Sequence, residues 1–167
     1  MKVFCGPKKS ALGRIGRKDL RVVLYGFAEK PTQASAGATL LRVIQRNKLA
    51  PQTYAFELLS ISLSVITADT AVRRADSPDG WTRQIELKVA VTDPEFWESK
   101  ANLLVELLSF LTTEIWSLEF VGQGYLHPLP DKPNFPNEKC VALLSGGLDS
   151  LVGAIDLVSG GKHPYAV

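Results

Sequence analysis

The sequence has few of the residues that mark secreted, metal-binding or membrane-spanning proteins. Only two of its 167 residues are cysteines, Cys5 and Cys140. Neither belongs to a C-x-x-C pair, so the sequence indicates no zinc site. Nothing in it resembles a signal peptide, and no apolar run is long enough to span a bilayer. We therefore expect a cytoplasmic protein in a reducing compartment, without a membrane partner.

The chain also has little excess charge of either sign, since its formal net charge is +2. So small a net charge is typical of an ordinary solvated surface, and on this ground we expect no nucleic-acid partner. Basic residues do gather near the N-terminus with glycines among them: Lys8, Lys9, Arg14, Arg17, Lys18 and Arg21, with Gly6, Gly13 and Gly16. They form either a basic loop that contacts phosphates or a solvated N-terminal segment.

The composition is otherwise that of a globular protein, with 46% hydrophobic and 22% charged residues, and the length suffices for one or two small cores. Leu20–Phe27 is rich in β-branched and aromatic residues, which is typical of a strand. Trp81–Thr92 alternates apolar and polar side chains, as a half-buried strand does. We predict a further strand over Trp116–Val121 and a short one over Met1–Cys5.

Two long helices are predicted between these strands. The first covers Pro51–Arg74, where apolar residues spread around the axis, so we expect it to be largely buried. The second covers Asp93–Thr113, which begins with an N-cap aspartate followed by a proline. Glu29–Gly37 is predicted as loop, and Thr39–Asn47 fits either a short strand or a helical turn.

These elements predict a compact α/β layer domain over residues 1–125, in which we find no catalytic cluster. Trp81, Trp97 and Trp116 lie at element boundaries beside apolar residues, which favours core packing over a base-stacking platform. Asp69 and Arg73 stand four residues apart on the first long helix, as a surface ion pair does.

A proline-rich segment follows this domain, with four prolines between Gly122 and Lys139. Prolines prevent a continuous helix or central strand and favour an extended, semi-rigid linker, which we place over residues 126–139. His127 lies in this linker beside a proline. We expect a solvated loop histidine there rather than a ligand.

The stretch Val141–Ser150, VALLSGGLDS, carries the most chemical information. A buried strand, a glycine turn and a helix N-terminus in this order form an anion cradle, because the first helical N–H groups lack intrahelical partners and the helix dipole adds positive charge. Gly146 and Gly147 permit close approach to a phosphate, and Ser145 and Ser150 add hydroxyl donors. No lysine follows the glycines, which excludes a Walker A loop. The bland alternative is a glycine turn that only joins a strand to a helix.

SGGLDS is similar to the S-G-G-x-D-S pyrophosphate loop of the N-type ATP pyrophosphatases. This PP-loop superfamily includes GMP synthetase, asparagine synthetase, tRNA-modifying sulfurtransferases and 7-cyano-7-deazaguanine synthase (QueC). Its members use ATP to adenylate a carbonyl or carboxylate oxygen, release pyrophosphate, and let a nitrogen or sulfur nucleophile displace AMP. The segment Asp93–Val121, with the preceding WTRQIEL, further resembles the N-terminal domain of QueC-like proteins in anti-phage islands such as the Qat system.

The resemblance implies ATP and Mg²⁺ as cofactors. Ser145 and the backbones of Gly146 and Gly147 would hold the β- and γ-phosphates, and Ser150 would complete the cradle. By analogy Asp149 binds Mg²⁺ or maintains the loop geometry; the alternative is that it caps the helix. The zinc site of QueC relatives uses cysteines downstream of this point, so its ligands are absent from this chain.

The resemblance also implies a fold and a function. Residues 140–167 would begin a Rossmann-like (adenine nucleotide alpha hydrolase-like) parallel sheet, and one strand, one helix and the start of a second strand suggest truncation. The parent activity would be a QueC-like ligase that adenylates a deazaguanine-type carboxylate for attack by an amine or ammonia, with a protein partner in anti-phage defence. The alternative is a non-catalytic docking module with an incomplete nucleotide domain, whose unpaired sheet edges a partner would cover.

Overall fold

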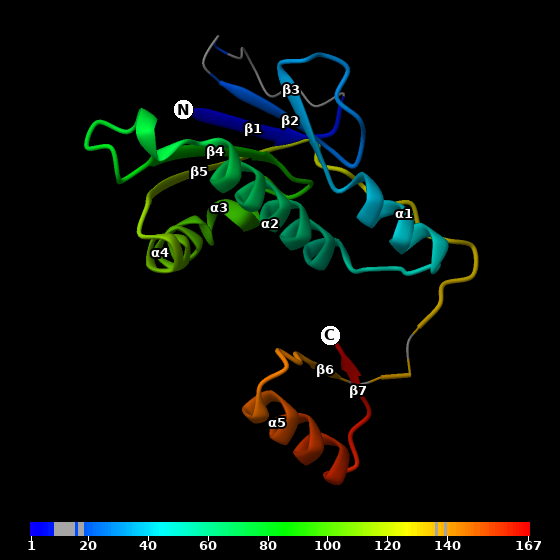
Figure 1. Cartoon of the computed structure of the whole chain (residues 1–167). Coiled ribbons are helices and arrows are strands. Elements are labelled where there is room, and N and C mark those ends of the chain that lie inside the picture. Colours follow the sequence, from blue (N-terminus) through cyan, green and yellow to red (C-terminus); the bar gives the residue numbers. More distant parts are fainter. Residues whose placement is uncertain (9–15, 17–18, 136, 139) are drawn as a thin grey trace. The chain divides into compact units, whose positions relative to one another are not determined.

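The computed structural model describes residues 1–8, 16, 19–135, 137–138 and 140–167. The chain divides into two compact units, Met1–Pro130 and Asp131–Val167. Both units combine helices with parallel strands, which confirms the predicted α/β class (Figure 1).

The first unit is built on a five-stranded sheet in the order β3-β2-β1-β4-β5, and every neighbouring pair is parallel. Its strands are β1 (Lys2–Gly6), β2 (Leu20–Leu24), β3 (Gln33–Ala36), β4 (Gln84–Ala90) and β5 (Ile115–Val121). The chain adds strands outward from β1 to β3, then crosses to the other side of β1 and continues with β4 and β5. The strand order therefore reverses between β1 and β4.

Helices form the connections from β3 to β4 and from β4 to β5, as is usual between parallel strands. They are α1 (Ala38–Arg46), α2 (Thr53–Ala71), α3 (Pro94–Glu98) and α4 (Ala101–Thr112), with a 3-10 turn over Arg74–Asp76. Asp93 caps α3, since its carboxylate accepts from the Phe96 N–H at 3.1 Å. In Figure 1, α2, α3 and α4 lie on one side of the sheet.

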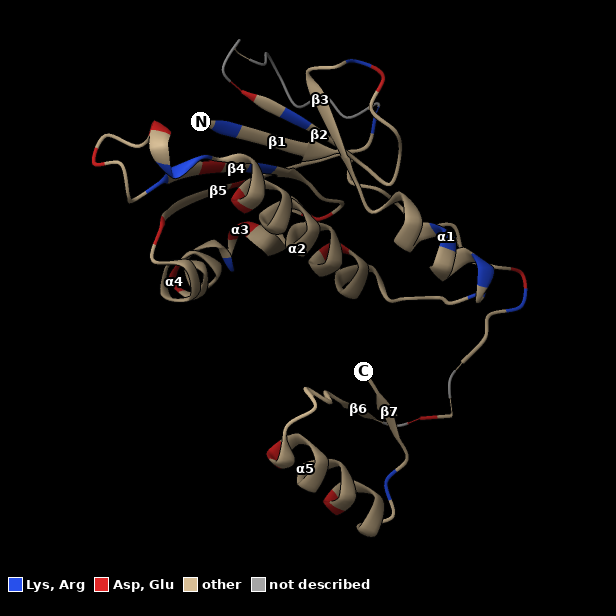
Figure 2. Ribbon diagram, viewed as in Figure 1, with Lys and Arg blue, Asp and Glu red and all other residues tan. Residues whose placement is uncertain are grey.

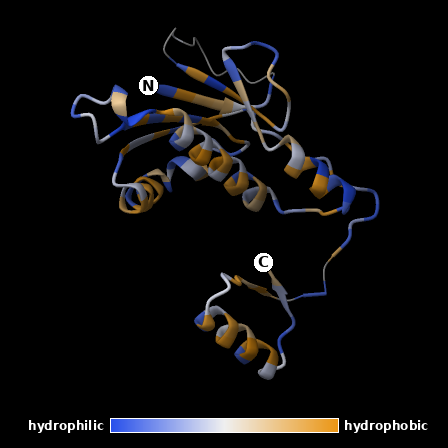
Figure 3. Cartoon of the chain, viewed as in Figure 1, coloured by the Kyte–Doolittle hydropathy of each residue, from blue (hydrophilic) through white to orange (hydrophobic). Residues whose placement is uncertain are grey.

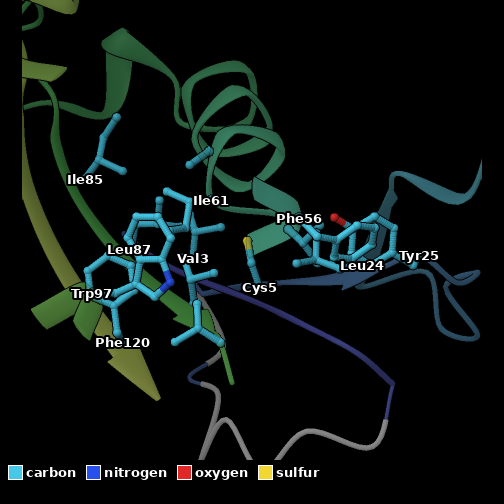
Figure 4. Close-up of a cluster of buried hydrophobic side chains, with 14 of the residues drawn as sticks. Val3, Cys5, Leu24, Tyr25, Phe56, Ile61, Ile85, Leu87, Trp97 and Phe120 are labelled. Carbon is cyan, nitrogen blue, oxygen red and sulfur yellow. The ribbon is translucent and has the colours of Figure 1, made fainter. Parts of the chain in front are cut away.

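The core lies between the sheet and these helices. The inward residues of β1 and β4 meet Phe56 and Ile61 of α2 and Trp97 of α3, as the sticks in Figure 4 show. Val3, Cys5 and Val89 are completely buried. The alternation of β4 that the sequence predicts is confirmed, because Ile85, Leu87 and Val89 all join this core.

The opposite face of the sheet carries charged side chains beside a small apolar cluster of Phe4, Ala90 and Val121. Lys2 of β1 pairs with Glu86 of β4 at 2.9 Å, and Lys88 of β4 pairs with Glu119 of β5 at 2.5 Å. Figure 2 shows these opposite charges on neighbouring strands. Each pair joins adjacent strands, on the face opposite α2, α3 and α4.

Helix α4 is largely hydrophobic in sequence, as its colour in Figure 3 shows, and much of this apolar surface is exposed. Leu104, Val105 and Leu108 pack against the core, yet no residue of α4 is buried. Four apolar side chains on its outer side are at least 49% exposed: Leu103, Leu107, Phe110 and Leu111.

Two buried carboxylates fasten the ends of β4. At its carboxyl end Glu57, 3% exposed, accepts hydrogen bonds from the Thr92 and Asp93 N–H groups, the Thr92 hydroxyl at 2.6 Å and the Trp97 indole at 2.8 Å. At its amino end the guanidinium of Arg83 lies 2.9 Å from Glu114, and both are buried. Hydrogen bonds to charged groups are stronger than those between neutral groups, so these contacts hold both ends of β4 in position.

The structure corrects several predictions about single elements. Gln33–Ala36, predicted as loop, is strand β3, and of the two alternatives for Thr39–Asn47 the helical one holds, since 39–46 belong to α1. Trp81 is 68% exposed, so the prediction that all three tryptophans are core is wrong for it. Asp69 pairs with Arg83 at 2.5 Å rather than with Arg73. Ile66 is 63% exposed, so α2 is buried on one side instead of all round.

Replacing the Glu57 carboxylate should destabilise the first unit strongly. Glu57→Ala leaves the Thr92 and Asp93 N–H groups and the Trp97 indole without their acceptor, and we expect a loss of about 3 kcal/mol or more in the free energy of unfolding. Urea titration followed by tryptophan fluorescence measures it. The control Glu106→Ala, on the exposed side of α4, should stay within about 0.5 kcal/mol of wild type. Equal effects of the two substitutions would contradict this account.

The buried Cys5 thiol makes stability depend on alkaline pH. Burial raises its pKa from 9.0 to about 12, against a hydrogen bond with Ser64 that lowers it. Above pH 9 the unfolded thiol ionises and the folded one does not, so stability falls as pH rises from 9 toward 12. Between pH 8 and 10 wild type should lose about 1 kcal/mol more than Cys5→Ala in urea unfolding. Cys140→Ala should keep the wild-type slope; the same slope in all three proteins would refute the assignment.

Candidate functional site

The second unit contains two parallel strands and the helix that connects them. Strand β6 (Cys140–Ala142) pairs with β7 (Pro164–Ala166), and α5 (Leu148–Ser159) runs between them. Cys140 is partly buried at the first position of β6. The pairing places the segment Leu143–Gly147 between the carboxyl end of β6 and the first turn of α5, where α/β proteins bind ligands.

The backbone of this turn presents free N–H groups. Gly146 has φ +82°, a left-handed conformation that residues with a Cβ adopt with strain. Gly147 is the N-cap of α5, and the first intrahelical bond runs from the Leu151 N–H to its carbonyl at 3.2 Å. The N–H groups of residues 148–150 precede that bond, so no helical carbonyl accepts from them. They are available to an anion, and the helix dipole favours one.

Two hydroxyls converge on the same turn. The Ser145 and Ser150 Oγ atoms lie 3.3 Å apart, and Ser145 Oγ accepts from the Gly147 N–H at 3.4 Å. Ser150 Oγ donates to the Gly147 carbonyl at 2.8 Å. The hydroxyls therefore hold the turn in place, and the long Ser145 contact leaves the Gly147 N–H weakly bound.

The turn borders a shallow hollow of about 340 Å³. It is lined by Leu144, Gly146, Gly147, Leu148, Ser150 and Leu151. Ser145 and Asp149 are exposed beside it, and Asp149 lies in the first turn of α5. Asp149 is not the N-cap of α5, as the alternative would have it, since Gly147 holds that position and Asp149 lies two residues further into the first turn. The Asp149 carboxylate therefore remains able to bind a cation.

The five residues predicted for phosphate binding thus lie in one continuous turn. The alternative, a turn that only connects a strand to a helix, has the same backbone, so the geometry permits anion binding without requiring it. Within the described residues no group of three or more His, Cys, Asp or Glu side chains could hold a metal ion. A Mg²⁺ ion at Asp149 would take further oxygens from a phosphate ligand and from water, as Mg²⁺ commonly does.

The basic N-terminal cluster is only partly within the described residues. Lys9, Gly13, Arg14, Arg17 and Lys18 lie outside them. Lys8 forms an ion pair with Glu29, and the Arg21 guanidinium donates to the Lys8 carbonyl at 3.1 Å. The predicted choice between a phosphate-binding loop and a solvated segment therefore stays open.

The structure places His127 differently from the prediction of a solvated loop histidine. Its ring stacks on Phe56 with centroids 5.4 Å apart, and its Nε2 lies 3.3 Å from the Leu49 carbonyl oxygen. No local pattern around His127 predicts these contacts, because Leu49 and Phe56 are more than 70 residues away in the chain.

Comparison of the chain with protein-family models, with curated proteins and with solved structures finds no match. In the described part of the chain, no helix is both long enough and apolar enough to cross a membrane.

The two glycines of the turn should respond differently to substitution. Gly146→Ala forces a Cβ into φ +82° and should cost the turn about 1 kcal/mol. At Gly147 the backbone is extended, with φ −85°, and a Cβ would meet only Ser145 Oγ at 3.5 Å, so Gly147→Ala should fold normally. Amide exchange of Leu151, whose N–H bonds to Gly147, reports on the turn. Equal acceleration of that exchange in both variants would refute this distinction.

Proposed function

We propose that the second unit binds ATP through the turn Ser145–Ser150, as the nucleotide-binding part of a QueC-like ligase of the PP-loop group. The observation that carries the proposal is the coincidence of the SGGLDS motif with a strand–turn–helix whose first-turn N–H groups are free. Motif and geometry are independent, because a six-residue pattern does not by itself place its residues after a parallel strand.

The presence of a glycine at position 147 is a further argument that this turn binds a ligand. Its extended backbone suits any residue, and the space around it admits a Cβ. The fold therefore gives no reason for glycine at this position. Close approach of a phosphate to the backbone does give one, since a side chain there would stand between the ligand and the N–H groups.

The division of roles follows from the chemistry of each group. The N–H groups at the start of α5 and the Ser145 hydroxyl would bind the β- and γ-phosphates, and Ser150 would hold the turn. Asp149 would contribute a carboxylate oxygen to the Mg²⁺ that accompanies ATP. In the reaction that the resemblance implies, a deazaguanine-type carboxylate oxygen attacks the α-phosphorus, pyrophosphate leaves, and an amine or ammonia then displaces AMP from the acyl carbon.

Calorimetric titration of the 167-residue chain with ATP and Mg²⁺ tests the binding step. We expect saturable binding, inorganic pyrophosphate as a competitor and AMP as a much weaker one, because the turn recognises the β- and γ-phosphates. At a hundredfold excess over the dissociation constant, ATP should stabilise the second unit by about 2.7 kcal/mol.

Ser145→Ala should weaken this binding by about tenfold, the value of one hydrogen bond to a charged group. The matched control is Ser159→Ala at the far end of α5, which should bind as wild type does. Gly147→Ala should fold and lose binding. Failure of ATP to bind wild type, or AMP binding as tightly as ATP, would sink the proposal.

A second candidate, a docking module, rests on the exposed apolar surface of the second unit. Leu143 and Tyr165 next to and in the two strands are 75% and 57% exposed, and Leu148 and Val158 of α5 are 74% and 60% exposed. A two-stranded sheet is only marginally stable in water without a further covering layer. Light scattering after size-exclusion chromatography tests this candidate, and a clean monomer with a stably folded second unit would count against it.

A further inference from the structure

The strand order of the first unit reverses at one point of its sheet. In open parallel sheets ligands bind outside the carboxyl ends of the strands at such a point. Here that point lies between β1 and β4, at the ends marked by Gly6 and Ala90. What lies across it is a segment of the same unit, Gly122–Pro130, which we call the strap.

The strap crosses the carboxyl edge of the sheet, from the β4 side of the reversal point to the β2 side. The Gly124 N–H donates to the carbonyl of Val91, the residue that follows β4, at 3.0 Å. The Tyr125 ring then packs on Tyr25, the residue that follows β2, with centroids 5.0 Å apart. Because β1 lies between β2 and β4 in the sheet, the strap passes over the carboxyl end of β1.

Gly124 is the position that lets the strap lie so close. A Cβ there would stand 2.5 Å from the backbone carbons of Val91 and 2.7 Å from the Thr92 nitrogen. Its neighbour Gln123 has φ 70°, a conformation that residues with a Cβ adopt with strain. The strap is therefore shaped to fit onto the end of β4.

The far end of the strap is held by the ring of His127. This ring stacks on Phe56, and Figure 4 shows Phe56 beside Tyr25 at the same end of the core. Since a carbonyl only accepts, Nε2 carries the proton that is shared with the Leu49 oxygen at 3.3 Å. The other ring nitrogen, Nδ1, is buried without a hydrogen-bond partner in the described part of the chain.

The two sides of the reversal point are held by different kinds of contact. On the β4 side, the Glu57 carboxylate binds the backbone of Thr92 and Asp93 and the Trp97 indole. The strap contacts include the Gly124 hydrogen bond, the rings of Tyr125 and His127 on Tyr25 and Phe56, and the His127–Leu49 contact. Beside them lies the buried Nδ1 of His127, and burial of a polar atom without a hydrogen bond costs free energy. Leu126 and Leu129 of the strap are more than 70% exposed.

We infer that the strap is a releasable plug, which occupies the ligand position of the first unit and detaches while the sheet remains folded. Release frees Phe56 and Tyr25 at the carboxyl edge. It also frees the six residues Tyr125–Pro130, which lengthens the connection to the second unit by up to about 20 Å. The inference does not depend on the proposed nucleotide site.

Native-state hydrogen exchange on the full chain, read by NMR at low urea concentrations, tests this inference. The Gly124 amide reports on the strap, and the Cys5 amide reports on the sheet. We expect Gly124 to exchange faster than Cys5 by a local opening with little urea dependence. His127→Ala should accelerate Gly124 at least tenfold and leave Cys5 unchanged, while the control Leu129→Ala should alter neither.

Gly124→Ala provides a second, steric route to the same state. Its Cβ should displace the strap, so residues 124–130 should lose protection while β1 and β4 keep theirs. The inference is overturned if Gly124 and Cys5 exchange together with the same urea dependence in wild type. It is also overturned if His127→Ala accelerates both amides equally or neither.

Discussion

The parallel pairing of β1 with both β2 and β4 is the constraint on which the first unit depends. Parallel neighbours cannot be joined by a tight hairpin, so the chain has to leave the sheet to reach each next strand. The longest of these excursions, from β3 to β4, carries α2 across the middle of the sheet. Close contact there selects small residues on the inner side of α2: Ser64 and Ala68 are completely buried, and Ser64 hydrogen-bonds the Cys5 thiol.

Two buried carboxylates then determine how β4 is held, and they do so in different ways. Glu114 forms ion pairs with Arg83 and Arg74, so the contacts at the amino end of β4 are between opposite charges. Glu57 instead collects neutral donors from Thr92, Asp93 and Trp97, at the carboxyl end. A buried ion pair contributes little net stability, whereas loss of either partner is costly. Both arrangements therefore act mainly as fixed anchors, and the one at Glu57 makes the carboxyl edge of β4 rigid.

The sequence predicted those features that depend on nearby residues. The alternation in 84–90, the Asp93 cap of α3 and the turn at Ser145–Gly147 are local patterns, and the structure contains all three. Strand β3 was missed because Gln33–Ala36 is short, has no β-branched or aromatic residue and lies between Pro31 and Gly37; its pairing with β2 makes it a strand. Asp69 and His127 were misjudged for the same reason, since Arg83 and Phe56 are close only in the fold. For the candidate site, the motif located the residues, but only the structure revealed that Gly147 has no conformational need to be glycine.

The two units differ in what lies at the carboxyl ends of their strands. In the second unit the end of β6 leads into a turn with exposed glycines, and the N–H groups of the following helical turn face no helical acceptor. In the first unit the corresponding edge is covered by the strap, and Gly124 rests against the end of β4. A parallel sheet offers its ligand position at this edge regardless of sequence. The chain therefore leaves this edge exposed in the second unit and covers it with its own residues in the first.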